Sequence, residues 1–354
     1  MRHRPLVQLL LVFVSLTSVH LGLRLLRNAV PTLDDSPDLY PREFLKDATK
    51  LNSRRSEIAE AFFKKSKYSY HKNAEVEVRI VASDRGSGYL LQTIAFLLNQ
   101  QEDGNFNIRI CNVESGIFPD LVQFAKTFRI DNVGGGRRKS SELDGQLAKE
   151  AEDYWNCLAL PTNSSFILLI EDDSLVAPKF HRILKSLTNQ LEEFIDIDFV
   201  KLYHLNRLRK IPFFVQTICM AILISFLLFS TVLRQIHPVI FLLIVPVIAY
   251  DFYGYGCQFP AEFRYALTGS AYMSLIESCC TPAVLFRTSS APAMTSYFMR
   301  QKASDGHAKD HILDESPFVG RQTDLNLVVH VGAFSSVRQH AVVLSDLNDM
   351  LNRV

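Results

Sequence analysis

Three consecutive carboxylates follow a short apolar run near the middle of the chain. Residues 166–170 are all apolar, and Glu171, Asp172 and Asp173 come directly after them. This composition predicts a strand that is buried on both faces and carries acidic groups at its end. Adjacent carboxylates repel one another, and a hard divalent cation such as Mn²⁺ or Mg²⁺ relieves that repulsion. The alternative is an ordinary acidic junction between a strand and a helix.

The spacing within this motif selects two metal ligands. Side chains alternate along an extended chain, so Glu171 and Asp173 should project to the same side. A metal held there can bridge the oxygens of a diphosphate and stabilise its departure. A third ligand is expected from His330, which ends the apolar run 327–329 and is followed by Gly332, Ser335 and Ser336. The alternative for His330 is a purely structural histidine.

The elements around these motifs alternate between strand and helix patterns. This order predicts an α/β domain with a parallel-centred sheet, whose ligands bind at the carboxyl ends of the strands. The part after residue 256 has few strand patterns of its own, so we expect it to complete the same sheet. We predict strands at 75–82, 106–113, 165–170, 198–203 and 325–331, and helices at 44–65, 89–98, 118–128, 142–158, 178–187 and 305–313.

Apolar residues are concentrated in three runs. Residues 6–23 follow Arg2 and Arg4 and predict a transmembrane signal anchor, the alternative being a cleaved signal peptide. Residues 213–233 and 238–250 predict a tandem transmembrane hairpin, the alternative being a buried helical pair in a soluble core. Basic residues next to these runs leave the orientation open under the positive-inside rule.

Charge and cysteine content narrow the class of protein. The chain has 38 basic and 37 acidic residues, so no basic excess points to nucleic acid. Asn163 begins a glycosylation sequon, and five of the six cysteines lie outside the apolar runs. Cys111 and Cys157 are candidates for one disulfide. These features favour a lumenal location for the domain, and no Cys-His spacing indicates zinc.

Taken together, these motifs resemble those of a known family. The chain resembles a GT-A glycosyltransferase in three features. These are a first half of alternating strands and helices, as in nucleotide-binding domains, the acidic triplet, and the late His-Val-Gly-x-x-Ser-Ser segment. The hairpin after the triplet is similar to that of the Golgi GPI-anchor side-chain transferases, the post-GPI-attachment family. The resemblance implies a GT-A domain split by a transmembrane hairpin, located in the Golgi membrane. It also implies metal-dependent transfer of N-acetylgalactosamine from UDP-GalNAc to the mannose core of GPI anchors.

The resemblance also assigns roles to individual residues. By position, Asp173 matches the metal ligand, and Val81, Ser83 and Arg85 match the segment where the first strand meets the nucleotide. Thr281 and Pro282 match a segment near the donor sugar. Asp310 lies in the late acidic helix that faces the acceptor, where one carboxylate removes the acceptor proton in inverting enzymes; Asp314 and Glu315 are alternatives for this base.

We therefore predict five segments and two rival functions. The segments are 1–27 (cytoplasmic tip and anchor), 28–73 (stem and leading helix), 74–210 (first part of the GT-A domain), 211–256 (hairpin) and 257–354 (second part). One rival is another Golgi GT-A enzyme, such as an N-acetylglucosaminyltransferase acting on N-glycans. The other is a non-catalytic three-span membrane scaffold.

Overall fold

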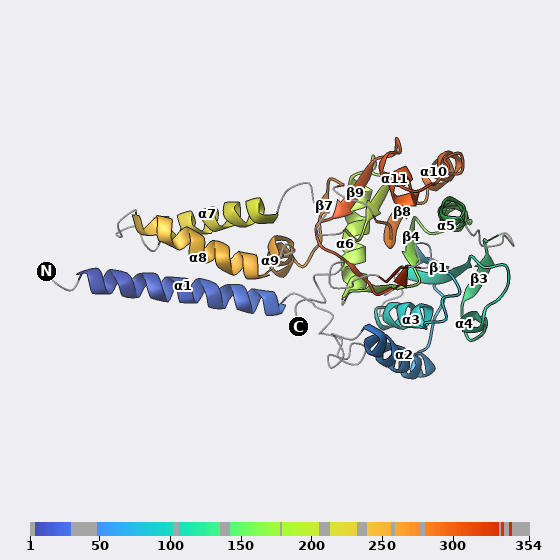
Figure 1. Ribbon diagram of the computed structural model, residues 1–354, viewed down its shortest axis with the longest axis horizontal. Helices are drawn as coiled ribbons and strands as arrows, with labels where there is room; N and C mark the ends of the chain where they lie inside the picture. Colours follow the sequence, from blue (N-terminus) through green and yellow to red (C-terminus); the bar gives the residue numbers. More distant parts are fainter. Residues whose placement is uncertain are drawn as a thin grey trace. The chain divides into compact units, whose positions relative to one another are not determined.

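The chain forms two compact units in the computed structural model. One unit comprises Met1–Val30 and Arg209–Gly269, and the other comprises Pro31–Leu208 and Ser270–Val354. Figure 1 labels the helices and strands of both units. The structure describes residues 4–29, 48–101, 106–134, 142–177, 179–204, 213–231, 239–255, 259–276, 280–332, 334–335 and 340–341.

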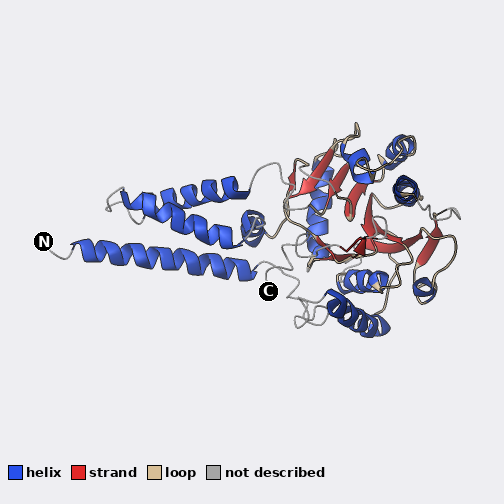
Figure 2. Ribbon diagram, in the orientation of Figure 1, coloured by secondary structure: helices blue, strands red, loops and turns tan. Residues whose placement is uncertain are grey.

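The first unit is helical, as Figure 2 shows. Its small core is made by residues of two helices and includes Ala221, Ile244, Ile248 and Phe252. Large apolar side chains such as Phe13 and Phe226 remain exposed. No helix in the described part of the chain is both long and apolar enough to cross a membrane, so the predicted anchor and hairpin are not confirmed. The helices are α1 (Arg4–Ala29), α7 (Phe213–Thr231), α8 (Val239–Tyr255) and α9 (Phe259–Thr268).

The second unit is built on an eight-stranded mixed sheet in the order β3-β2-β1-β4-β8-β6-β9-β7. Strands β3, β2, β1 and β4 are parallel, β8 is antiparallel to β4 and β6, and β7 is antiparallel to β9. The strands are β1 (Val76–Ala82), β2 (Phe106–Asn112), β3 (Arg129–Asn132), β4 (Phe166–Glu171), β6 (Phe199–Lys201), β7 (Met273–Ser274), β8 (Ala283–Arg287) and β9 (Gly320–Thr323). This mixed α/β architecture fits the predicted GT-A-type domain.

Strand order locates the switch point of the sheet. The chain runs outward from β1 to β2 and β3, and β4 then returns to the other side of β1. In open α/β sheets, ligands bind outside the carboxyl ends of the strands where the order reverses in this way. Here that point lies after Ala82 in β1 and after Glu171 in β4.

Helices cover the sheet and complete its core. Helix α5 packs against β1 and β4, while α10 and α11 pack against α5. The core includes Trp155 of α5, whose ring stacks on Phe298 of α10 at 4.2 Å between centroids. The helices of this unit are α2 (Ala48–Lys65), α3 (Tyr89–Asn99), α4 (Pro119–Val122), α5 (Leu143–Leu158), α6 (Phe180–Glu193), α10 (Ala291–Phe298) and α11 (Lys309–Asp314).

Most predicted elements are confirmed, but the helix at 118–128 is wrong. Only α4 is helical there; turns follow it, and the unpredicted strand β3 begins at Arg129. Phe124 and Phe128 have helical spacing because they join an aromatic cluster with Phe63, at 5.1 and 6.4 Å between ring centroids. The periodicity therefore reflects packing of one aromatic cluster.

The later part of the chain does complete the first sheet. Strand β8 inserts between β4 and β6, and β9 adds beside β6. A shorter antiparallel pair joins β5 (Ser174–Val176) to β10 (Val328–His330), and β11 (Phe334–Ser335) pairs with β12 (His340–Ala341).

Cysteines connect neighbouring layers of the unit. Cys111 of β2 and Cys157 of α5 form a disulfide with a Cα–Cα distance of 5.8 Å, which confirms the predicted pair. Cys280 is also disulfide-bonded, while Cys219 in α7 is free and exposed. Asn163 of the predicted sequon is exposed, and the Ser164 hydroxyl donates to the carbonyl of Ala74 at 2.8 Å.

Candidate functional site

The acidic motif forms a turn between two strands. Strand β4 ends at Glu171, Asp172 and Asp173 make the turn, and β5 begins at Ser174. The antiparallel register of β5 and β10 places His330 opposite Ser174. The amide N–H of Val331 also donates to the carbonyl of Asp173 at 2.8 Å. This pairing brings a histidine from far along the chain to the acidic turn.

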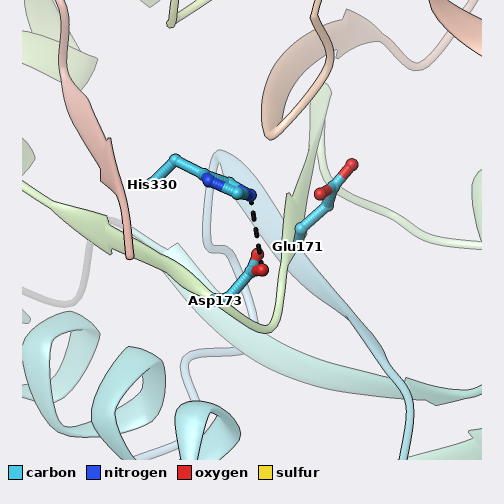
Figure 3. Close-up of side chains that lie close together, drawn as sticks. All are labelled: Glu171, Asp173 and His330. Atoms are coloured by element: carbon cyan, nitrogen blue, oxygen red, sulfur yellow. Dashed lines mark ion pairs between the residues drawn. The ribbon is translucent and has the colours of Figure 1, made fainter. Parts of the chain in front are cut away.

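Glu171, Asp173 and His330 form one cluster (Figure 3). One potential ligand atom from each lies within 4.8 Å of the other two. His330 Nε2 is 3.3 Å from Asp173 Oδ2; Asp173 is buried, while Glu171 and His330 are half-buried. The structure thus brings together the three residues that we predict to bind the metal.

The two carboxylate oxygens of Asp173 have different surroundings. Oδ2 forms ion pairs with the guanidinium of Arg85 and the ring of His330. Oδ1 is buried and has no hydrogen-bond partner among the described residues. An unsatisfied buried carboxylate oxygen is costly unless a cation or donor reaches it. Together with the oxygen and imidazole ligands beside it, Oδ1 fits a divalent cation such as Mn²⁺ or Mg²⁺.

Asp172 fixes the loop that follows β1. Its Oδ2 accepts the N–H of Ser83 at 2.9 Å, and its Oδ1 lies 3.3 Å from Arg85 Nε. Its backbone carbonyl accepts the Thr93 hydroxyl of α3 at 2.7 Å. Burial raises the pKa of Asp172, and the charge of Arg85 acts against that rise. Ser83 and Arg85, which we predict to lie near the nucleotide, therefore contact the acidic turn directly.

Electrostatics keep Asp173 ionised. Burial acts to raise its pKa, but the positive charges of Arg85 and His330 outweigh burial and leave the pKa well below its usual range. Burial lowers the pKa of His330, yet the carboxylate of Asp173 raises it more, so the net shift is upward. The Asp173 carboxylate therefore carries a negative charge at neutral pH, at the point where a cation fits.

Glu171 connects the turn to later parts of the chain. Its amide N–H donates to the carbonyl of Pro282 at 2.8 Å, and its carboxylate lies 3.0 Å from Lys309 Nζ. The carbonyl of Thr281 accepts the hydroxyl of Tyr154 at 3.3 Å. Val81 pairs with Glu171 in the register of β1 and β4, and its side chain packs against the core. Thr281 and Pro282 thus adjoin the acidic motif.

The predicted base Asp310 lies in the first turn of α11. Lys309, its neighbour in sequence, pairs with Glu171 and so connects the start of α11 to the end of β4. Asp310 Oδ1 is 3.4 Å from His311 Nδ1. Burial raises the pKa of Asp310, but the charges of Lys309 and His311 lower it to a net value below the ordinary one.

The two alternatives for the base are placed differently. Asp314 forms an ion pair with the fully buried side chain of Lys201 in β6, so its carboxylate is already engaged. Glu315 is 65% exposed and lies 3.8 Å from His307. Of the three acidic residues, Asp310 alone follows directly on the lysine that contacts the acidic motif.

Two lysines of the site were not singled out by the sequence. Lys201 is a charged residue within the apolar pattern of its strand. This break in the pattern could have indicated a buried charge. Lys309 stands in a polar run and gave no such signal, although its side chain is only 10% exposed. Its ammonium group also lies 5.5 Å from the ring centroid of Tyr154.

Comparison with known proteins places the whole site inside one matched region. A family model described as GPI-N-acetylgalactosamine transferase PGAP4 matches residues 76–330. The match begins at the first residue of β1 and ends at His330, the third member of the cluster. It therefore contains the sheet, the acidic turn and the helix that carries Asp310.

Proposed function

The chain belongs to the GPI-N-acetylgalactosamine transferase PGAP4 family of glycosyltransferases, and we propose that it transfers N-acetylgalactosamine from UDP-GalNAc to the mannose core of GPI anchors. The observation that carries this proposal is the cluster of Glu171, Asp173 and His330 at the switch point of the sheet, inside the matched region. A nucleotide-sugar diphosphate needs positive charge where its leaving group develops negative charge.

The acidic turn would hold a divalent cation, Mn²⁺ or Mg²⁺. Asp173 supplies the buried oxygen Oδ1, and Glu171 and His330 supply the other two protein ligands. A bound cation would neutralise diphosphate charge as UDP departs. Ser83 and Arg85, which contact the same turn, would orient the nucleotide, and Thr281 and Pro282 would border the sugar.

Asp310 would act as the base. Its lowered pKa keeps the carboxylate ionised at neutral pH, which is the state that accepts a proton. The acceptor hydroxyl gives its proton to Asp310 while its oxygen bonds to the anomeric carbon. The bond from that carbon to the diphosphate oxygen breaks in the same displacement, which inverts the configuration.

The acceptor suggests a location. The GPI glycan is carried at a bilayer surface, so an enzyme held at that surface would meet it at a raised effective concentration. We place the protein in the Golgi membrane with its catalytic domain in the lumen, anchored through 1–27 and 211–256. Exposed apolar side chains of the helical unit, among them Phe13 and Phe226, support contact with lipid. Release of the full chain from membranes by alkaline carbonate would contradict this placement.

Complementation tests the proposed activity. Cells that lack the N-acetylgalactosamine side chain on GPI anchors would receive the wild type, Asp173→Ala or the control Asp196→Ala, whose side chain is exposed. We expect the wild type and the control to restore the side chain and Asp173→Ala to fail. Restoration by Asp173→Ala would favour a non-catalytic scaffold. Failure of the wild type, together with hydrolysis of UDP-N-acetylglucosamine, would favour a different GT-A enzyme.

A further inference from the structure

Helix α11 is too short to hold its own position. It contains six residues, Lys309–Asp314, and helices of this length are unstable without tertiary contacts. Only Ile312 and Leu313 anchor it in the apolar core. The proposed base Asp310 lies on this helix. The position of its carboxylate therefore depends on the other contacts that hold α11 in place.

The N-terminal end of α11 is fixed by Lys309. Its ammonium group forms ion pairs with Glu150 of α5 and with Glu171 at the end of β4. These two contacts connect one helix end to two separate elements. Lys309 touches a proposed metal ligand, so its own substitution would disturb the metal site as well as the helix.

The C-terminal end is fixed by a second lysine from a different strand. Lys201 lies in β6, between β8 and β9, and its side chain is fully buried. It forms an ion pair with Asp314, the last residue of α11. Breaking this ion pair would leave the buried ammonium group of Lys201 without its partner, which is strongly unfavourable. We therefore expect the contact to be maintained.

We propose that Lys201 is a positioning residue for the transfer reaction: through its ion pair with Asp314 it holds α11 in place and thereby sets the position of Asp310. This inference rests on the proposed function, in which Asp310 is the base. It extends that function to a residue in the middle of the sheet. A base displaced by about 1 Å can lose roughly 100-fold in rate, so the anchor matters for kcat.

The charge of Lys201 also reaches Asp310. The charged groups that face Asp310 are Lys309, His311 and Asp314 on its own helix and Lys201 from β6. The three basic groups favour its ionised form, and the carboxylate of Asp314 opposes it. Glu150 and Glu171 face Lys309, and Asp314 faces Lys201. Removal of Lys201 therefore shifts the pKa of Asp310 upward and moves the acid limb of kcat to higher pH. A residue with a merely structural role would not move that limb.

The test compares Lys201→Met, Asp314→Asn and the double variant with wild type. Lys126→Met is the matched control, because Lys126 is exposed and lies outside the site. Initial rates of sugar transfer would be measured over a range of pH and donor concentration, and UDP binding in Mn²⁺ by calorimetry. We expect kcat to fall about 10- to 100-fold in each single variant. KM for the donor and UDP affinity should stay within about twofold, and the acid limb of Lys201→Met should move to higher pH.

The outcomes separate this inference from the proposed function. An unchanged kcat in Lys201→Met, or a loss seen only as reduced UDP affinity, would overturn the positioning role while the transferase assignment stands. A wild type that transfers no sugar would overturn both. If Lys201→Met does not fold, the double variant Lys201→Met/Asp314→Asn decides the question, because it removes the ion pair and leaves neither charge unpaired. An unchanged kcat in that variant would also overturn the inference.

Discussion

Gly332 lies so close to Asp173 that a Cβ atom at position 332 would fall 2.1 Å from Asp173 Oδ2. The same Cβ would lie 3.2 Å from Cε1 of His330. The glycine after β10 is therefore what allows the histidine strand to approach the acidic turn. The two halves of the proposed metal site meet because position 332 has no side chain.

Gly332→Ala should damage the metal site. The added methyl group must displace the Asp173 carboxylate or the strand that carries His330, so Mn²⁺ affinity should fall by roughly 10- to 100-fold, as for disturbed metal surroundings in general. Calorimetry with Mn²⁺ measures the change. Gly116→Ala is the control, because a Cβ there meets nothing within 4 Å. Equal Mn²⁺ affinity in the two variants would contradict the close approach.

Arg85→Met should make stability depend on metal. Arg85 forms ion pairs with both Asp172 and Asp173, and removal of one partner of a buried ion pair costs about 3–5 kcal/mol. Thermal unfolding in EDTA should show a clearly lowered Tm, and Mn²⁺ should recover more of it than in the wild type, since a ligand stabilises the folded state it binds. A variant with the same Tm in EDTA as the wild type would argue against this charge balance.

The disulfide between Cys111 and Cys157 should contribute strongly to stability. It closes a loop with a sequence separation of 46, for which the loss of chain entropy predicts about 4 kcal/mol. Denaturant unfolding of Cys111→Ala/Cys157→Ala would measure the free energy of unfolding. The control is Cys219→Ala, which removes a free, exposed thiol and should have little effect. A loss below about 1 kcal/mol would show that the bridge constrains the unfolded chain little.

Asp310→Asn should remove the base but leave donor binding intact. We expect kcat to fall by about 10²–10⁴-fold, the usual contribution of general base catalysis, with UDP affinity unchanged. In the wild type, the lowered pKa keeps Asp310 ionised at neutral pH, and kcat falls only as the pH drops through that lowered value. Glu315→Gln, an exposed alternative, is the control. If the control loses as much activity as Asp310→Asn, the base is misassigned.

The central sheet and the acidic turn could be predicted from the sequence, and the reason is physical. Strands such as β4 are buried on both faces, so nearly all their residues are apolar and stand out from the pattern around them. The end of such a strand is then fixed to within a residue, which located Glu171 and Asp173. Burial also explains the correct prediction for α5, whose apolar residues repeat with a helical period.

The contacts between segments that are distant in the chain were harder to predict from the sequence. The pairing of β10 with β5, which sets His330 beside Asp173, depends on register, and the sequence of either strand alone does not encode its partner. The ion pair between Lys201 and Asp314 joins residues that are far apart in the chain and have no shared motif. The antiparallel insertion of β8 between β4 and β6 likewise follows from topology, which local patterns do not specify.

The most direct test is a transfer assay with the purified full-length chain, UDP-GalNAc and a GPI glycan acceptor, in EDTA and with added Mn²⁺. Asp173→Asn keeps the size of the side chain and removes the charge that holds the cation. We predict transfer to the acceptor mannose with Mn²⁺, none in EDTA, and a loss of roughly 10²–10³-fold in Asp173→Asn. Equal transfer in EDTA and Mn²⁺, with full activity in Asp173→Asn, would contradict a metal-dependent transferase site at Asp173.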